Sequence, residues 1–190
     1  MKERLPPGQR KINRFPTLQA GGIPIHLRKE NWTLEIYGEV KNPKLYTYEE
    51  FIQLPKTKIQ TDIHCVTGWS LFDTEWEGVL FRSIVNIVKP TEKAKFVVFE
   101  CEDLGGRFTT SLPLIDLMRD ETILAFKYNG KDLENKHGGP VRSVVPKKYF
   151  YKSAKWVRKL KFTEKDEIGY WEQGGYSNTA NPWKEERYAL

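Results

Sequence analysis

Cysteine and histidine are scarce in this chain. Its 190 residues include only 2 Cys and 3 His. Two cysteines cannot supply the four thiolates of a Cys₄ zinc site or of a common iron–sulfur cluster. They also cannot build the disulfide framework of a small secreted protein, and the haem-attachment motif CxxCH is absent. If the protein performs redox chemistry, its sequence offers no second redox centre through which electrons could pass.

Long apolar runs are missing as well. No stretch approaches the roughly 18 consecutive apolar residues of a membrane-spanning helix. The basic, proline-punctuated amino terminus lacks the apolar segment of a signal peptide. These absences predict a cytoplasmic protein with no membrane span. The net charge of +6 suggests an anionic ligand or partner, without distinguishing nucleic acid from a phosphate-bearing cofactor.

What is present is typical of a folded domain. Apolar residues make up 39% of the chain and aromatic residues 13%, which is enough for a substantial core. The length predicts a single domain over residues 1–190. We expect residues 1–24 to form an irregular arm, because prolines and glycines punctuate them, and residues 164–190 to form a wrapping tail.

Hydrophobic periodicity predicts a mixed α+β, β-rich fold of short strands and short helices. A capping-box pattern at residues 47–50 starts a short helix that Pro55 stops. Apolar residues spaced three to four apart predict a helix over 81–88, closed by Pro90, and a further short helix is expected over 114–118. The expected strands cover residues 32–40, 58–65, 96–99, 108–112, 123–128, 131–133, 141–145 and 156–162.

Cys65 is the first candidate for chemistry. It stands where the expected strand 58–65 runs into a loop, with Gly68 marking the turn. Its thiolate would suit a soft metal or nucleophilic attack, whereas a lone cysteine is often just a small buried residue. Adjacent strand residues point to opposite faces, so His64 is a poor base for Cys65, which weakens a cysteine-hydrolase interpretation. Cys101 is expected in or near the core.

Two further segments could bind an anion. Residues 147–162 contain seven Lys or Arg and no acidic residue, with aromatic residues interleaved. This run could be a solvated strand face, a phosphate site or a nucleic-acid surface. In the loop His137–Arg142, two glycines would let the backbone approach a ligand, and Arg142 could grip a phosphate. A tight loop with a surface arginine is an equally good interpretation.

The order of motifs along the chain is more specific than any one of them. The motifs are Gly21-Gly22-x-Pro24, DIHCVTGWS at 62–70, WEGV at 76–79, HGGPVR at 137–142 and YFYKSAKWV at 149–157. This arrangement resembles the catalytic domain of the sulfite-oxidase-type molybdopterin oxidoreductases, and most of all their small stand-alone prokaryotic members. The resemblance extends from about residue 5 to residue 188.

The resemblance implies a molybdopterin cofactor with molybdenum, tungsten being the alternative metal, and it assigns roles to particular residues. Cys65 would be the protein's only ligand to the metal, since the pterin dithiolene supplies the other sulfur atoms. The residues implied for cofactor binding are Gly21, Gly22, His137, Arg142, Lys152, Ser153, Ala154 and Lys155, the last four through backbone N–H groups and lysines at the anionic tail. The candidate pocket residues are His64, Trp69, Asp103 and Arg107.

The chain also departs from the family pattern. Sulfite oxidases proper carry Arg-Asn-His in the arm and arginines just after the metal cysteine, whereas this chain has residues 20–22 as Ala-Gly-Gly and 66–69 as Val-Thr-Gly-Trp. The resemblance therefore implies oxygen-atom transfer on a small-molecule substrate, either a sulfoxide or a sulfite-like oxyanion. Electrons would be exchanged with an external partner. The alternative is a non-enzymatic nucleic-acid-binding module that uses residues 147–162; the enzyme interpretation implies no nucleic-acid partner.

Overall fold

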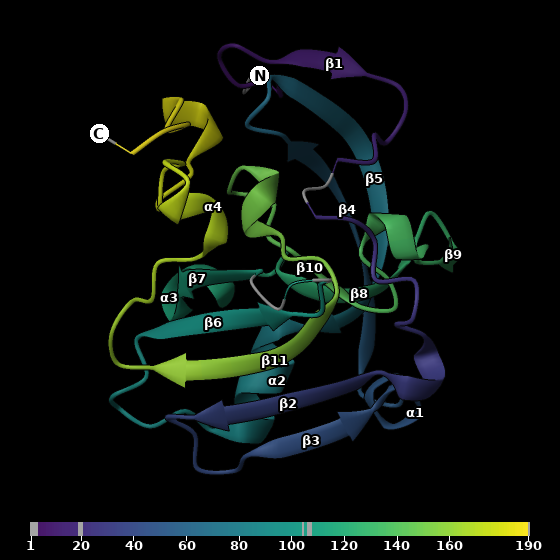
Figure 1. The fold of residues 1–190 in the computed structure, drawn as a ribbon, viewed down its shortest axis with the longest axis vertical. Helices are drawn as coiled ribbons and strands as arrows, with labels where there is room; N and C mark the ends of the chain where they lie inside the picture. The colour runs from purple at the N-terminus through teal and green to yellow at the C-terminus, as the bar shows by residue number, and fades with distance from the viewer. Residues whose placement is uncertain (1–3, 19–20, 104, 106–107, 190) are drawn as a thin grey trace.

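The computed structural model describes residues 4–18, 21–103, 105 and 108–189. It shows two β-sheets joined by short helices, and this confirms the expected α+β class (Figure 1). Strand β1 of the amino-terminal arm and the carboxy-terminal tail lie at the same end of the molecule, at the top of Figure 1. Among the helices that the structure describes, none has the length and apolar content needed to cross a membrane.

One sheet has five strands in the order β3-β2-β11-β6-β7. Their bounds are β3 (Lys44–Thr47), β2 (Thr33–Gly38), β11 (Val157–Thr163), β6 (Phe96–Cys101) and β7 (Thr109–Pro113). The alternation that predicted β2 has its expected cause, because Leu34 and Ile36 point into the core and are fully buried. β11 runs parallel to β2 and antiparallel to β6, so it stands at the centre of this sheet.

The second sheet has six strands and is dominated by the long antiparallel pair β4 and β5. Its members are β1 (Arg10–Ile12), β5 (Trp69–Leu80), β8 (Ile123–Tyr128), β10 (Arg142–Val144), β4 (Lys56–His64) and β9 (Lys131–Asp132). The sequence analysis missed β5 as a strand. Asp73 has a positive φ of 56°, and the β4–β5 register shifts between Thr61 and Ile63, so a bulge interrupts the alternation there.

The helices are short; α1, α2 and α3 lie near where the sequence indicated, whereas α4 and the 3₁₀ turns were not predicted. The bounds are α1 (Tyr48–Phe51), α2 (Phe81–Val88), α3 (Leu114–Leu117), α4 (Tyr170–Gln173), and the 3₁₀ turns η1 (Lys29–Asn31), η2 (Asn135–His137), η3 (Phe150–Lys152) and η4 (Pro182–Lys184). The capping box of α1 is present: Glu50 N–H donates to Thr47 Oγ1 at 3.3 Å, and Thr47 N–H donates to Glu50 Oε2 at 2.8 Å. Lys89, in the left-handed region, ends α2 just before Pro90.

The arm is more ordered than expected. β1 lies within it and pairs in parallel with β5, with Arg10 opposite Trp69. The tail carries α4 and η4, and Arg187 near its end donates to the carbonyl oxygens of Val66, Pro7 and Gly8. The arm and the tail therefore meet at the turn that follows β4.

The core is divided into two main clusters. The larger lies between the five-stranded sheet, α2 and part of the second sheet, and includes Trp32, Phe81 and Phe99. The smaller lies within the second sheet and includes Trp76 and Cys65. Trp76 is fully buried in this cluster and packs against Phe15, Tyr128 and Phe150.

Candidate active site

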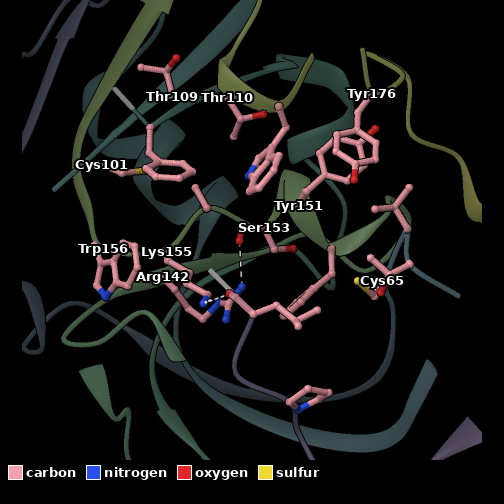
Figure 2. A pocket seen from close by; sticks show the side chains of 18 of the residues that line it. Cys65, Cys101, Thr109, Thr110, Arg142, Tyr151, Ser153, Lys155, Trp156 and Tyr176 are labelled. Carbon is pink, nitrogen blue, oxygen red and sulfur yellow. Dashed lines mark hydrogen bonds between the residues drawn. The ribbon is translucent and has the colours of Figure 1, made fainter. Parts of the chain in front are cut away.

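A cavity of about 270 Å³ opens between the turn that follows β4 and the segment that leads into β11. Figure 2 places Cys65 at one side of it and Cys101 with Trp156 at the other, with Ser153, Lys155 and Arg142 between them. Its walls are largely aromatic. The aromatic residues that line it are Phe15, Trp69, Phe108, Phe150, Tyr151, Trp156, Trp171 and Tyr176.

Cys65 lies on the cavity wall, at the first position of the turn, because β4 ends one residue before it. The turn is closed by Gly68 N–H donating to Cys65 O at 3.0 Å and by Cys65 N–H donating to Trp69 O at 2.8 Å. Gly68 has a φ of 95°, a conformation that favours glycine. Cys65 Sγ lies 3.2 Å from Thr67 Oγ1, and burial raises the pKa of the thiol. The strand-to-turn position expected for Cys65 is confirmed.

His64 points away from the cavity, which corrects its assignment as a pocket residue. Its Nδ1 lies 2.8 Å from Ser70 Oγ, and its ring packs edge-on against Trp183 with centroids 5.9 Å apart. Burial lowers the pKa of His64 to about 4. The alternation of side chains along a strand explains why neighbouring Cys65 and His64 face opposite ways. Trp69, by contrast, lines the cavity.

Arg142 lies at the cavity and is almost fully buried, so it is not the surface arginine that the loop also allowed. It donates from NH1 to His137 O at 2.7 Å and from NH2 to Ser153 O at 2.8 Å. Its guanidinium lies 4.2 Å from the centroid of the Phe150 ring. Burial lowers the pKa of Arg142 to about 9. These described hydrogen bonds to carbonyl oxygens orient the charge, and they do not neutralise it.

Lys155 brings a second cation to the same cavity. Its Nζ donates to Leu18 O at 2.7 Å and to Lys136 O at 3.3 Å. Burial and, to a smaller extent, the charge of Arg142 lower the pKa of Lys155 to about 7. No salt bridge among the described residues involves either cation. A buried and a half-buried cation, neither with a carboxylate partner among the described residues, create a cavity suited to an anion.

The depressed pKa of Lys155 predicts a pH-dependent stability for the ligand-free chain. Lys155 titrates near 10.5 when unfolded and near 7 when folded, so the folded state binds fewer protons between these values. Stability then rises with pH across that window, and the full penalty applies below pH 7. Urea unfolding of the wild type and of Lys155→Met would measure this effect. We expect the free energy of unfolding of the variant, relative to that of the wild type, to fall by about 2 kcal/mol from pH 7 to pH 9. A difference between the two proteins that does not change with pH would contradict the depressed pKa.

The two glycines of the 137–142 loop are required by packing. A Cβ on Gly138, whose φ is 102°, would lie 2.9 Å from the Lys155 side chain. A Cβ on Gly139 would lie only 2.0 Å from Leu133 O. The expectation that these glycines also open the backbone to a ligand stays a prediction. Their smallness lets the loop press against Lys155 and hold it at the cavity.

Two expectations for the segment before β11 also need correction. The N–H of Ser153 donates to Phe150 O at 3.1 Å, and that of Ala154 donates to Ser143 Oγ at 2.7 Å. These N–H groups are thus engaged within the chain, although both residues line the cavity. Lys152 does not line it. Its fully buried ammonium pairs with Glu172, so its charge is neutralised inside the fold.

The other residues implied for cofactor binding, His137, Gly21 and Gly22, are not among the described residues that line the cavity. The His137 ring stacks on Phe15, with centroids 4.2 Å apart, and Phe15 in turn lines the cavity. Burial lowers the pKa of His137 to about 4, and its buried Nδ1 has no hydrogen-bond partner among the described residues. Gly21 and Gly22 both have positive φ, but neither forms part of the described lining.

Of the remaining pocket candidates, Asp103 is not among the lining residues, and its charge contributes to raising the pKa of Cys101. Arg107 lies outside the described residues. Cys101 packs against the larger core cluster, as expected, and it also lines the cavity, which the sequence analysis did not foresee. Half of the aromatic wall was missed too; Phe15 and Trp171, for example, reach it from the arm and the tail. The aromatic residues that the sequence did indicate are Trp69, expected in the pocket, and those inside the basic run.

These residues fit a metal ion whose other ligands are supplied by a bound cofactor and not by the protein. No group of three or more His, Cys, Asp or Glu side chains among the described residues could hold a metal ion. Cys65 offers one soft thiolate, and Arg142 and Lys155 offer uncompensated positive charge to an anionic tail. The unpartnered Nδ1 of His137 and the surrounding aromatic rings suit a polar, planar organic group.

Comparison with known proteins agrees with this geometry. Residues 20–171 match the family model described as "Oxidoreductase molybdopterin binding domain". The chain is 38% identical to "Uncharacterized oxidoreductase YuiH" of Bacillus subtilis over 97% of this chain and 92% of that protein. It is 34% identical to "Protein-methionine-sulfoxide reductase catalytic subunit MsrP" of Burkholderia mallei over 82% of this chain and 52% of that protein. The chain thus spans about half the length of that relative.

A solved structure is similar as well. The sulfane dehydrogenase SoxCD from Paracoccus pantotrophus matches with a TM-score of 0.67 and 26% identity, over 75% of this chain and 40% of that one. The match agrees with the arrangement of mixed sheets and short helices described above.

Proposed function

The chain belongs to the molybdopterin-binding oxidoreductase family, and from that premise we propose that it removes the oxygen atom of a sulfoxide. It is an enzyme of the sulfite-oxidase-like class with a molybdenum–pterin cofactor that supports oxygen-atom transfer. The observation that carries the choice of substrate is the cavity wall beside Cys65. Val66 and Trp69 stand there, where an oxyanion site would need cations. A neutral sulfoxide fits such a wall better than a charged sulfite ion.

The chain's own residues have distinct tasks in this proposal. Cys65 would hold the metal, and Arg142 with Lys155 would hold the anionic end of the pterin. When bound, the cofactor supplies a centre that exchanges two electrons and accepts an oxygen atom. The aromatic wall excludes water from the reacting sulfur. Overall, the S–O bond breaks, two electrons and two protons are consumed, and a thioether and water are released.

The basic run over 147–162 does not form a free cationic surface, and the comparisons give no support to a nucleic-acid-binding module. Six of its seven cations are paired with a carboxylate, and the seventh, Lys155, lines the cavity. The pairs are Lys147–Glu121, Lys148–Asp116, Lys152–Glu172, Arg158–Glu102, Lys159–Glu35 and Lys161–Glu167, and Lys155 points to the cavity. Charges already neutralised by neighbouring carboxylates release few counterions on meeting a phosphate backbone.

The cofactor content of the purified protein tests the class of enzyme directly. We expect about one equivalent of molybdenum or tungsten per chain by elemental analysis, together with a fluorescent pterin after acid release. With reduced methyl viologen as donor, a peptide containing methionine sulfoxide should be reduced, while in a separate assay with ferricyanide as acceptor sulfite should not be oxidised at a comparable rate. A protein with neither metal nor pterin would contradict the family's chemistry here. Sulfite oxidation that is faster than sulfoxide reduction would contradict only the proposed substrate, and not the family's chemistry.

Electrons must then come from outside the chain, because its two cysteines cannot bind a cluster. We propose a separate electron carrier as the physiological partner. A cytoplasmic location stays a prediction, which cell fractionation with antibody detection would test.

A further inference from the structure

The hydroxyl group of Thr67 lies against the sulfur atom of Cys65. Thr67 is exposed and lines the cavity, two residues after Cys65 in the turn that follows β4. Its Oγ1 is 3.2 Å from Cys65 Sγ, and in a neutral pair either atom can be the donor. A thiolate bound to a metal has no proton to donate. In the loaded protein the Thr67 hydroxyl must therefore be the donor and the sulfur the acceptor.

Backbone groups of the same turn act in the same direction. Burial raises the pKa of the Cys65 thiol, and hydrogen bonds from the Thr67 hydroxyl and from the N–H groups of Thr67 and Val66 oppose that rise. Each of these donors favours a negative charge on the sulfur. Successive N–H groups of a turn that converge on one atom form an anion-binding nest, and Thr67 adds a side-chain donor to this one.

The carbonyl groups of the turn are bound from outside it. Those of Cys65, Val66 and Gly68 accept hydrogen bonds from the arm or the tail. The donors are Gln9 Nε2 to Cys65 O at 3.1 Å, Arg187 NH1 to Val66 O, and Arg10 N–H to Gly68 O at 2.9 Å. Because both ends of the chain hold these carbonyl groups, the turn keeps its donors directed at the sulfur.

We propose that Thr67 donates a hydrogen bond to the metal-bound sulfur of Cys65 and thereby raises the reduction potential of the metal. This inference rests on the proposed function, because it takes Cys65 as the metal ligand. A hydrogen bond to a ligating sulfur withdraws electron density from it and stabilises the reduced metal. Thr67 is thus a positioning residue that acts through Cys65, and its effect is to let a weaker external donor reduce the metal.

The midpoint potential of the bound metal tests the hydrogen bond, measured by redox titration of the holoenzyme through its electronic spectrum. Thr67→Val keeps the shape of the side chain and removes the hydroxyl, whereas Thr67→Ser keeps the hydroxyl. We expect Thr67→Val to shift the equilibrium about tenfold toward the oxidised metal, which is about 30 mV for a two-electron couple. Thr67→Ser should stay within about twofold of the wild type.

Thr109→Val is the matched control. It makes the same change in the same cavity, near Cys101 and on the side opposite Cys65 (Figure 2), and it should leave the potential unchanged. Loss of the metal from folded Thr67→Val, with the metal kept in Thr67→Ser, would also support the hydrogen bond. The proposal is overturned if Thr67→Val has the potential of the wild type, or if Thr67→Ser or Thr109→Val changes it equally.

Substrate kinetics separate this role from a contact with the substrate. The KM for a sulfoxide peptide should change by no more than about twofold in Thr67→Val, because the hydroxyl is engaged by the sulfur. A KM that rises at an unchanged potential would assign the hydroxyl to the substrate and overturn the inference. A wild type without metal and pterin would overturn the proposed function itself, whereas a loaded wild type with the potential of Thr67→Val would overturn only this inference.

Discussion

Replacement of Cys65 by serine should leave a folded protein without activity. The side chain is only 8% exposed, and serine has nearly the same shape, so the turn from Cys65 to Gly68 should still form. Serine cannot supply the soft thiolate that a metal held by sulfur ligands prefers. Loss of an outer-shell partner alone costs roughly 10–100-fold in metal affinity or activity, and we expect the loss here to be at least about 100-fold. Sulfoxide-reduction assays and the electronic spectrum of the metal would measure it.

Cys101 provides the matched control, because it is the second free cysteine and lines the same cavity. Cys101→Ser should keep the metal, its spectrum and most of the activity. Full activity and an unchanged spectrum in Cys65→Ser would refute the assignment. If Cys101→Ser lost the metal and Cys65→Ser kept it, the metal ligand would be Cys101 and not Cys65.

Local patterns predicted a good part of the fold. Alternation located β2, because Leu34 and Ile36 are buried while their neighbours are partly exposed. The capping box located α1, because its hydrogen bonds depend on residues only three positions apart. β5 was missed because the bulge at Asp73 breaks the alternation, and a bulge is stabilised by pairing with a distant strand.

The candidate site was predictable only where it depends on neighbouring residues. The strand-to-turn position placed Cys65, and strand alternation already argued against His64 as its partner. The burial of Arg142 was not predictable, because it depends on Phe150 and on carbonyl groups brought together by the fold. Nor could the sequence separate Lys152 from Lys155. One is neutralised by a glutamate from the tail, and only the other reaches the cavity.

That glutamate supports the second large prediction: Glu172→Gln should strongly destabilise the protein. Lys152 and Glu172 form an ion pair whose side chains are 0% and 2% exposed. Thr110 Oγ1 also donates to Glu172 Oε1, at 2.8 Å, and Lys152 Nζ donates to Ser111 O at 2.8 Å. Glutamine can keep hydrogen bonds, but it leaves a buried ammonium without a counter-charge. Breaking such a pair costs about 3–5 kcal/mol in the free energy of unfolding.

Urea unfolding of a small set of variants would separate charge from packing. Lys152→Met/Glu172→Gln should recover much of the stability lost in Glu172→Gln, because no uncompensated charge remains. The control pair Lys161–Glu167 is exposed, so Glu167→Gln should cost no more than about 1 kcal/mol. Because Trp171 beside Glu172 lines the cavity, Glu172→Gln should also loosen the aromatic wall and raise the KM for a sulfoxide peptide. Equal destabilisation by Glu172→Gln and Glu167→Gln would show that the buried pair does not anchor the tail.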